Sequence, residues 1–397
     1  MTVTVDHLSA ATKRLREHPH DQGAWLELAA IHHALGNTED AESLFATIGE
    51  GARIGGQVAL AVACGRHLAE LGSVHGPELI DAVVESYAAG AAPAAAPTAP
   101  EEAPSVPAGN GTPLEEARAL VKALTTWLLN RKVKAAPAPL LSGLSKPGAR
   151  ALIGVMTARA FGAGAVIIEV DQPATSMYWL AHGTLVVARD GTELGELHTG
   201  ALFGEIALVG GTKRTARVTA REDCWVLEIP ARAVETAATK HPKLAEVLAH
   251  HARARLLANL TRTSELFRAL SDDDRDVLLA KFSTQLVPAG TTFITEGERN
   301  EHLWVVVSGR CHVQSAGAAI ADLGPGAAVG EISLVSGVVA VASVTAIEPA
   351  VLLRLSKADF DVVAKKHPKL LAEVEKLVVA RETANRALFQ DASDLIV

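Results

Sequence analysis

One short stretch of the chain, residues 200–216, has residue types that could hold an anion and a sugar together. Gly204 precedes a predicted helical turn over residues 205–208, and Arg214 follows it. The first amides of such a turn are unpaired donors at the positive end of a dipole, so they favour an anion, and Gly204 lets the backbone approach it. Arg214 can neutralise the anion with a forked pair of hydrogen bonds. Glu205 would be out of place there unless it accepts hydrogen bonds from a sugar hydroxyl, so the stretch predicts nucleotide recognition without catalysis.

This stretch resembles the phosphate-binding cassette of cyclic nucleotide-binding domains, the family that includes the regulatory subunit of cyclic-AMP-dependent protein kinase and the catabolite activator protein. The resemblance rests on Phe203-Gly-Glu-Ile-Ala-Leu208 and on Arg214-Thr-Ala216. It implies that Glu205 takes the ribose 2′-hydroxyl, and that Arg214 and nearby backbone amides hold the cyclic phosphate. The implied ligand-binding positions are Gly204, Glu205, Ile206, Ala207, Arg214, Thr215 and Ala216. The alternative is a β-turn with an incidental salt bridge.

The chain repeats itself at a constant offset of 126 residues, since residues 141–244 match residues 267–370 without a gap. A constant offset indicates a duplicated domain. In each copy, short apolar strands separated by glycines and turns predict a small antiparallel jelly roll. Helices are expected to flank the first jelly roll, over residues 146–156 before it and 231–260 after it. The resemblance to the family covers residues 139–385.

The second copy of the cassette departs from the first at its positive charge. Gly330 and Glu331 are kept, but Ala340 stands at the position of Arg214, among valines. An anion bound there would lose its water without gaining a counter-charge, and an unpaired buried charge costs on the order of several kcal/mol. We therefore expect a non-binding copy kept for packing or for a partner. The alternative is a different, less charged ligand.

The first 90 residues show helical periodicity. The pattern is carried by Trp25, Leu28, Ala29, His32, Gly36, Ala41 and Phe45. Its order resembles a tetratricopeptide repeat, with a generic helical bundle as the alternative, and further helices are expected near 56–71 and 77–88. Small residues let such helices pack closely, which makes a groove for an unidentified protein partner plausible. The histidines at 18, 20, 32 and 33 lack the spacing of metal ligands, so no metal is expected.

An Ala- and Pro-rich segment over residues 91–113 predicts an extended linker, because it has almost no large apolar side chain. Thr112 as N-cap and Pro113 at the first position predict a helix that begins there and abuts the next domain. The fold class is α+β multidomain, with an all-α repeat-like region followed by two tandem jelly rolls. The expected domains are a tetratricopeptide-like domain at 1–90, the linker at 91–113, a cyclic-nucleotide-binding domain with an intact cassette at 114–262, and a second with a degenerate cassette at 263–397.

Composition argues against several classes of function. The 397 residues include 37 Lys and Arg against 45 Asp and Glu, a net charge of −8, so no broad nucleic-acid surface is expected. Residues 381–397 are too short and too weakly basic for a DNA-binding helix-turn-helix after the second jelly roll. The three scattered cysteines predict buried thiols of a cytoplasmic protein. No signal peptide, membrane span, P-loop or nucleophile–base–acid set is apparent, so we expect no enzyme and no membrane anchor.

These observations favour a cytoplasmic receptor for cyclic AMP or cyclic GMP. Ligand in the first jelly roll would shift the helix after it, with a lid over the base around residues 250–256, and change how the N-terminal helices engage another protein. Binding can do this only if it favours one conformation over another. The alternative is a ligand-independent interaction scaffold, although intact Glu205 and Arg214 argue against it.

Thr215 bears on the choice of base. By resemblance to the family, a hydroxyl at this position can accept from the guanine amino group and favours cyclic GMP, whereas general frequency in the family favours cyclic AMP. We predict that Thr215→Ala weakens binding of cyclic GMP much more than that of cyclic AMP, because only guanine has an amino group at that edge. Calorimetric titration with both nucleotides checks this, and equal losses would show that the hydroxyl does not contact the base.

Overall fold

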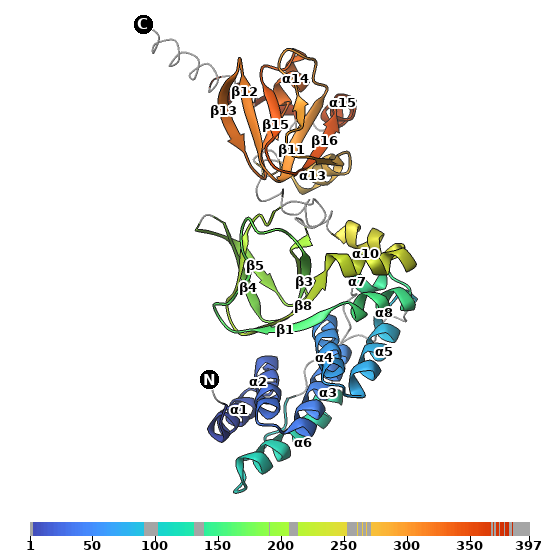
Figure 1. Ribbon diagram of the computed structural model, residues 1–397, viewed down its shortest axis with the longest axis vertical. Coiled ribbons are helices and arrows are strands. Elements are labelled where there is room, and N and C mark those ends of the chain that lie inside the picture. Colours follow the sequence, from blue (N-terminus) through green and yellow to red (C-terminus); the bar gives the residue numbers. More distant parts are fainter. Residues whose placement is uncertain are drawn as a thin grey trace. The chain divides into compact units, whose positions relative to one another are not determined.

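The computed structural model describes residues 3–90, 102–130, 139–189, 191–205, 213–251 and 271–366, with scattered single residues between 260 and 383. The chain forms two compact units, one made of residues 1–205 and 216–251, the other of residues 206–215 and 252–397. The first unit contains the N-terminal helices and one β-sandwich, and the second unit contains another β-sandwich (Figure 1). The predicted fold class is therefore confirmed.

The N-terminal region is built from helices of which α1 to α5 each pack against the next. Their bounds are α1 Val5–Glu17, α2 Gln22–Ala34, α3 Thr38–Ile54, α4 Val58–Glu70, α5 His75–Tyr87 and α6 Pro113–Asn130. The apolar face predicted from the sequence is buried, with Trp25 2% and Phe45 1% exposed. The tetratricopeptide-like character of the region remains a prediction.

Glycines in the left-handed region end three of these helices. They are Gly36, Gly56 and Gly72, with φ of 79°, 76° and 77°. After α4, the amide of Gly72 donates to the carbonyl of Ala69 at 3.1 Å, and the amide of Ser73 donates to the carbonyl of Leu68 at 3.0 Å. This pair of bonds is a Schellman C-cap, which glycine adopts without the penalty of a Cβ. The local sequence therefore sets the short turns between consecutive helices.

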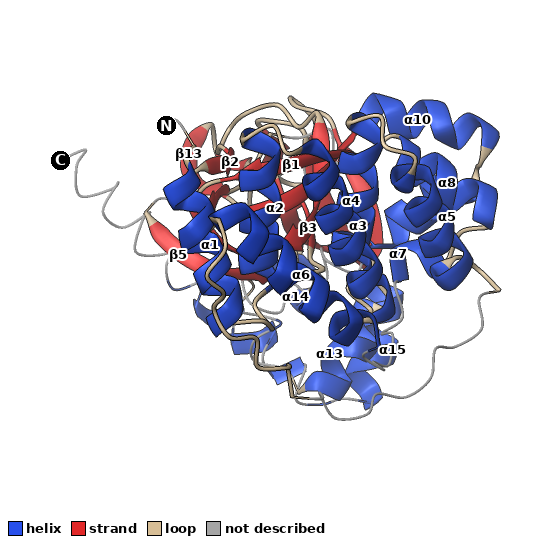
Figure 2. Cartoon of the chain, turned by 90° about the horizontal axis from the view of Figure 1, so that it is seen from below, coloured by secondary structure: helices blue, strands red, loops and turns tan. Residues whose placement is uncertain are grey.

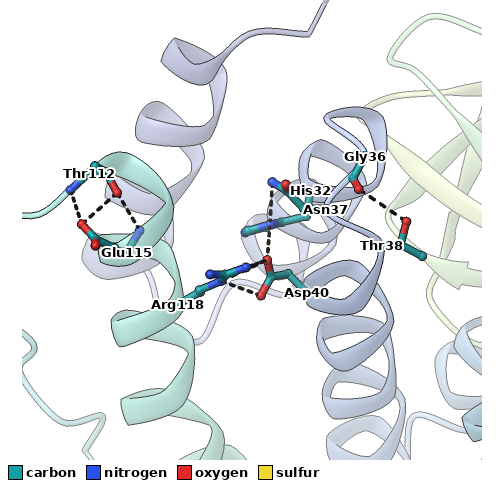
Figure 3. Close-up of polar contacts among 8 residues, drawn as sticks. All are labelled: His32, Gly36, Asn37, Thr38, Asp40, Thr112, Glu115 and Arg118. Carbon is teal, nitrogen blue, oxygen red and sulfur yellow. Dashed lines mark hydrogen bonds and ion pairs between the residues drawn. The ribbon is translucent and has the colours of Figure 1, made fainter.

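Helix α6 follows the linker in sequence but packs against α1 and α3. Thr112 caps it, since its hydroxyl accepts from the amide of Glu115 at 3.4 Å while its own amide donates to Glu115 Oε2 at 2.8 Å. The guanidinium of Arg118 donates to both carboxylate oxygens of Asp40 on α3, at 2.9 and 2.8 Å (Figure 3). His32 Nδ1 lies 3.7 Å from the same carboxylate, and burial lowers the pKa of this imidazole.

The apolar face of α6 explains its position among the N-terminal helices. Ala117, Leu120 and Leu124 are at most 1% exposed, so the helix removes a continuous stripe from water. The sequence predicts that this helix abuts the following domain, whereas its main contacts are with α1 and α3. The capping residues Thr112 and Pro113 located the start of the helix but carried no information about which neighbour covers its apolar stripe.

The first sandwich consists of two antiparallel sheets. The described strands of one run in the order β1-β8-β3-β6 and those of the other in the order β2-β7-β4-β5. Their bounds are β1 Thr157–Phe161, β2 Val166–Ile168, β3 Ser176–His182, β4 Thr184–Arg189, β5 Thr192–His198, β6 Leu202–Phe203, β7 Arg217–Ala220 and β8 Cys224–Pro230. Helices α7 Pro139–Ser142 and α8 Lys146–Gly154 precede the strands, and α10 Ala231–Lys240 follows them. Inward-facing residues such as Leu180 and Val226 are fully buried between the sheets.

The second sandwich repeats this topology. Its described strands run in the orders β14-β11-β16-β9 and β10-β15-β12-β13. Their bounds are β9 Ser283–Val287, β10 Thr292–Ile294, β11 His302–Ser308, β12 Cys311–Ser315, β13 Ala318–Leu323, β14 Ala328–Val329, β15 Ser343–Ala346 and β16 Ala350–Ser356. Helices α13 Asp272–Leu279, α14 Glu331–Ser336 and α15 Lys357–Lys366 accompany them. Most strands begin 126 residues after their counterparts, as β9 does after β1, so the duplication predicted from the sequence is confirmed.

The helix predicted over residues 231–260 is interrupted. Helix α10 ends at Lys240, and residues 243–251 are helical after a break. Pro242 disfavours helical geometry in His241, whose φ of −131° leaves the helical region. Residues 252–259, and with them most of the predicted lid, lie outside the described residues.

Within the first unit, the N-terminal helices cover the outer face of the sheet that contains β3 and β8. Helix α4 packs against β1, β3 and β8, and in Figure 2 it lies in front of β1 and β3. The ring of Trp225 on β8 lies 5.6 Å from that of Phe45 and 5.2 Å from that of His67. Arg66 Nε donates to the carbonyl of Met156 at 2.7 Å. The helical region is therefore packed on the sandwich through an aromatic cluster, Phe45, His67 and Trp225.

Neither a membrane-spanning helix nor a cluster of metal ligands occurs among the described residues. No described helix is long and apolar enough to cross a bilayer. The same residues contain no group of three His, Cys, Asp or Glu side chains that could hold a metal ion. The cysteines Cys64, Cys224 and Cys311 are buried free thiols, as predicted, and burial raises the pKa of Cys224 to about 11.

The aromatic cluster makes the first unit sensitive to acid. Burial lowers the pKa of His67 below the usual 6.5, and it also lowers the pKa of His32 and His182. The unfolded chain therefore binds more protons in this range, so the stability contributed by neutral imidazoles is complete above about pH 6.5 and is lost as the pH falls toward the folded pKa values. We predict that His67→Phe reduces this loss, as measured by denaturant unfolding at about pH 7.5 and about pH 5.5.

The matched control is His198→Phe, which changes an imidazole whose side chain is 71% exposed. An equal reduction in both variants would contradict the assignment to the aromatic cluster.

Candidate functional site

The first cassette begins at the end of β6, an edge strand held by β3. Phe203 pairs with Tyr178 across the two strands, and their rings stack with centroids 5.3 Å apart. Gly204 follows with a φ of 79°, a conformation that side chains with a Cβ rarely adopt. The turn at Gly204 brings the chain directly to Glu205. The strand and the glycine thus set the position from which the cassette starts.

Buried charge distinguishes the positions singled out by sequence. Among the Asp, Glu, Lys and Arg residues that the structure describes, only Glu205, Arg214 and Glu331 are buried, at 2%, 6% and 2% exposure. Such side chains are rarely buried without paired partners, because removing an ionised group from water is costly. All three belong to the two cassettes, so the charges withdrawn from solvent in the described part of the chain lie at the candidate sites.

The remaining predicted positions of the first cassette have mixed outcomes. Thr215 and Ala216 are half-buried and lead into β7. Ile206 and Ala207 lie outside the described residues. The ligand-binding role of these positions therefore remains a prediction.

The second cassette lines a cavity of about 270 Å³. Seven of the lining residues are the counterparts, at the 126-residue offset, of the seven predicted ligand-binding positions. They are Gly330, Glu331, Ile332, Ser333, Ala340, Val341 and Ala342. Positions chosen from a sequence motif in one copy thus form the wall of a single cavity in the other.

The comparison with known families agrees with this geometry. The model of the cyclic nucleotide-binding domain matches residues 158–241 and residues 284–367, at the same offset of 126. The chain carries two tandem cyclic nucleotide-binding domains.

Similar proteins include regulatory subunits and kinases. The chain is 25% identical over 225 residues to a cAMP-dependent protein kinase regulatory subunit of Candida albicans, covering 56% of this chain and 47% of that protein. It is 28% identical over 246 residues to the cGMP-dependent protein kinase egl-4 of Caenorhabditis elegans, covering 60% and 29%. The regulatory domain of Toxoplasma gondii PKA, solved with cAMP, overlaps 62% of this chain and 92% of that one, with a TM-score of 0.30 and 18% identity. The chain spans about half or less of the length of these curated relatives.

Part of the wall of the cavity in the second cyclic nucleotide-binding domain was not predicted. Val313 on β12, Ile320 on β13 and Ile294 on β10 also line it. Their counterparts in the first domain are Val187, Leu194 and Ile168 on β4, β5 and β2. Alternating apolar residues in the strands of both copies, compared at the 126-residue offset, were the signal that could have identified this wall.

Gly330 has a structural reason to be glycine in addition to any ligand. Its φ is 86°, and a Cβ there would lie 2.5 Å from both Asn300 Nδ2 and the carbonyl oxygen of His302. Asn300 Nδ2 donates to that carbonyl at 2.7 Å, which fixes the obstacle in place. The sequence predicts that Gly204 allows close approach of an anion, whereas backbone conformation and packing already require a glycine at its counterpart, Gly330.

The position of Ala340 is fixed by the backbone of a neighbouring turn. Its amide donates to the carbonyl of Glu298 at 2.8 Å, and its carbonyl accepts from the amide of Gly297 at 2.8 Å. The side chain is 4% exposed, and none of the residues lining the cavity is Lys, Arg or His. The second domain thus keeps a cavity and a buried carboxylate where the first has both Glu205 and Arg214.

Proposed function

We propose that this protein is a non-catalytic receptor for cyclic AMP or cyclic GMP, which binds one cyclic nucleotide in the first of its two domains. In this proposal Glu205 accepts from the ribose 2′-hydroxyl, and Arg214 holds the cyclic phosphate with backbone amides of residues 206, 207 and 215. The single observation that carries it is the burial of Glu205 and Arg214, because charged side chains withdrawn from water need strong partners. Similarity to both a cAMP-dependent regulatory subunit and a cGMP-dependent kinase leaves either base possible.

A continuous set of contacts supports coupling between the first cassette and the N-terminal helices. Gly204 and Glu205 continue directly from β6, which pairs with β3, and β3 packs against α4. Beside it, Trp225 on β8 contacts Phe45 and His67. Ligand that moves β6 would therefore act on the surface where the helices are packed. Such a route transmits a signal only if the ligand binds one arrangement better than the other.

The output we propose is engagement of a protein partner by the N-terminal helices, controlled by the nucleotide. Because the helices pack on the sandwich through the aromatic cluster, the nucleotide would loosen or tighten that packing and change which helical surface is free. In this proposal, nucleotide binding and its effect on the helices involve neither a metal nor a catalytic group. The location we expect is the cytoplasm. A ligand-independent scaffold would need neither Glu205 nor Arg214 as a buried charge in the first cassette.

Calorimetry of the full chain tests nucleotide binding. We predict that Arg214→Ala weakens binding by about 1.5–3 kcal/mol, or roughly 10–150-fold, since hydrogen bonds to a charged group are lost. Glu205→Ala should cost less, and should matter little for a 2′-deoxy cyclic nucleotide. The matched control is Arg217→Ala, which removes an exposed arginine that pairs with Glu169 at 2.9 Å. Parent-like binding in both cassette variants would refute the site, and no binding by the parent would favour the scaffold.

Hydrogen exchange tests the coupling. We expect saturating nucleotide to change amide exchange in α4 of the full-length protein, because α4 packs on the strand that pairs with β6. In the Arg214→Ala variant the change should require correspondingly more nucleotide. Trp225→Ala should reduce the change in α4 while leaving nucleotide binding close to that of the parent. Unchanged exchange in α4 at saturation would contradict coupling through this surface and leave the binding proposal intact.

A further inference from the structure

The cavity of the second domain, between the cassette and strands β10, β12 and β13, has a wall of unusual chemistry. It has the volume of a small-ligand site and is mostly apolar, yet it contains one buried carboxylate. We propose that this cavity binds a neutral nucleoside rather than a cyclic nucleotide. The assignment of the ribose rests on the function proposed for Glu205 in the first domain.

The charge of the wall excludes a phosphate. Glu331 is the one ionisable side chain among the lining residues, and it is 2% exposed. Ala340, at the position of Arg214, contributes only a methyl group. A cyclic phosphate in this cavity would lose its hydration without gaining a positive side chain, which is unfavourable by several times the thermal energy. A ligand with the same sugar and base but no phosphate avoids this cost.

The polar groups of the wall suit hydroxyls. The oxygens of a carboxyl group accept hydrogen bonds, so Glu331 suits a ligand with O–H or N–H donors. Glu331 occupies the same position in its copy as Glu205, for which we propose the ribose hydroxyl. Ser333 stands where the first copy has Ala207, and it adds a hydroxyl that is 5% exposed. One carboxylate and one hydroxyl, with no positive charge, match the edge of a ribose.

The apolar part of the wall suits a base. Val313 and Ile320 lie on the neighbouring strands β12 and β13, and Val341 lies near the C-terminal end of the cassette. Val341 is 48% exposed, and Val338 and Val339 beside it are 46% and 52% exposed, so apolar surface continues outward from the cavity. A planar base would cover part of that surface. Ligand sites commonly measure about 300–1,000 Å³, and this cavity, at about 270 Å³, lies just below that range, which favours a nucleoside over a larger cofactor.

Titration of the full-length protein with nucleosides tests the proposal. Adenosine, guanosine, their 2′-deoxy forms, cyclic AMP and cyclic GMP are each titrated by calorimetry. We expect one nucleoside per chain, and we expect Glu331→Gln, which conserves volume, to weaken it about tenfold or more. The 2′-deoxy forms should bind the parent more weakly. The same substitution in the other copy, Glu205→Gln, should leave nucleoside binding unchanged and weaken the cyclic nucleotide.

A second variant covers the case in which Glu331→Gln does not fold. Ile320→Trp fills the cavity from a half-buried position and should abolish nucleoside binding without affecting the cyclic nucleotide. The proposal is overturned if no nucleoside binds at millimolar concentration. It is also overturned if cyclic nucleotide binds twice per chain and Glu331→Gln removes one of the two. If no cyclic nucleotide binds but a nucleoside does, with sensitivity to Glu331→Gln, the function proposed for the first domain fails and the neutral-ligand site stands.

Discussion

The cost of taking a charge out of water is the constraint on which the two nucleotide-binding domains depend. A β-sandwich of this size is held by apolar contacts between its sheets, and an ionised side chain inside it must be compensated. The described part of the chain buries Glu205, Arg214 and Glu331 and no other Asp, Glu, Lys or Arg. In this part of the chain, buried charge therefore lies at the cassettes, where a ligand or a fixed partner can compensate it.

The two copies differ at that constraint while sharing almost everything else. Strand order and the register between strands are the same in both, and both cassettes start from a glycine in the left-handed region. Ala340 at the position of the arginine would change the class of ligand that the second cavity accepts, because the shape of the site is set by the strands and its charge by single residues. A fold can thus be conserved while its ligand changes, which is why function is argued from the site.

The N-terminal helices are part of the same compact unit as the first sandwich. Arg66, the aromatic cluster and α6 give this unit an interior that extends from the helices to the outer face of a sheet. The helical layer packs on the sheet that carries β6, so a small movement of the cassette would change the contacts between that sheet and the helices. Partner binding and nucleotide binding would then share one free energy of coupling, and each would alter the other by the same factor.

Sequence alone determined the duplication, the jelly-roll strands, the helical nature of the first 90 residues and the missing charge at Ala340. These are properties of local pattern and of residue identity at a constant offset, which survive without knowledge of three-dimensional neighbours. It also located Glu205 and Arg214 by motif, although their role stays a prediction.

Only the tertiary structure decided which surfaces meet. The capping residues located the start of α6 but could not tell that α1 and α3 cover its apolar stripe, and Trp225 had no sequence signal linking it to Phe45 and His67. The wall formed by Val313 and Ile320 likewise depends on pairing between distant strands. Local sequence sets the conformation of each segment, whereas burial is a property of contacts between segments far apart in the chain, so the cavity and the packed helical layer became visible only when the segments were assembled.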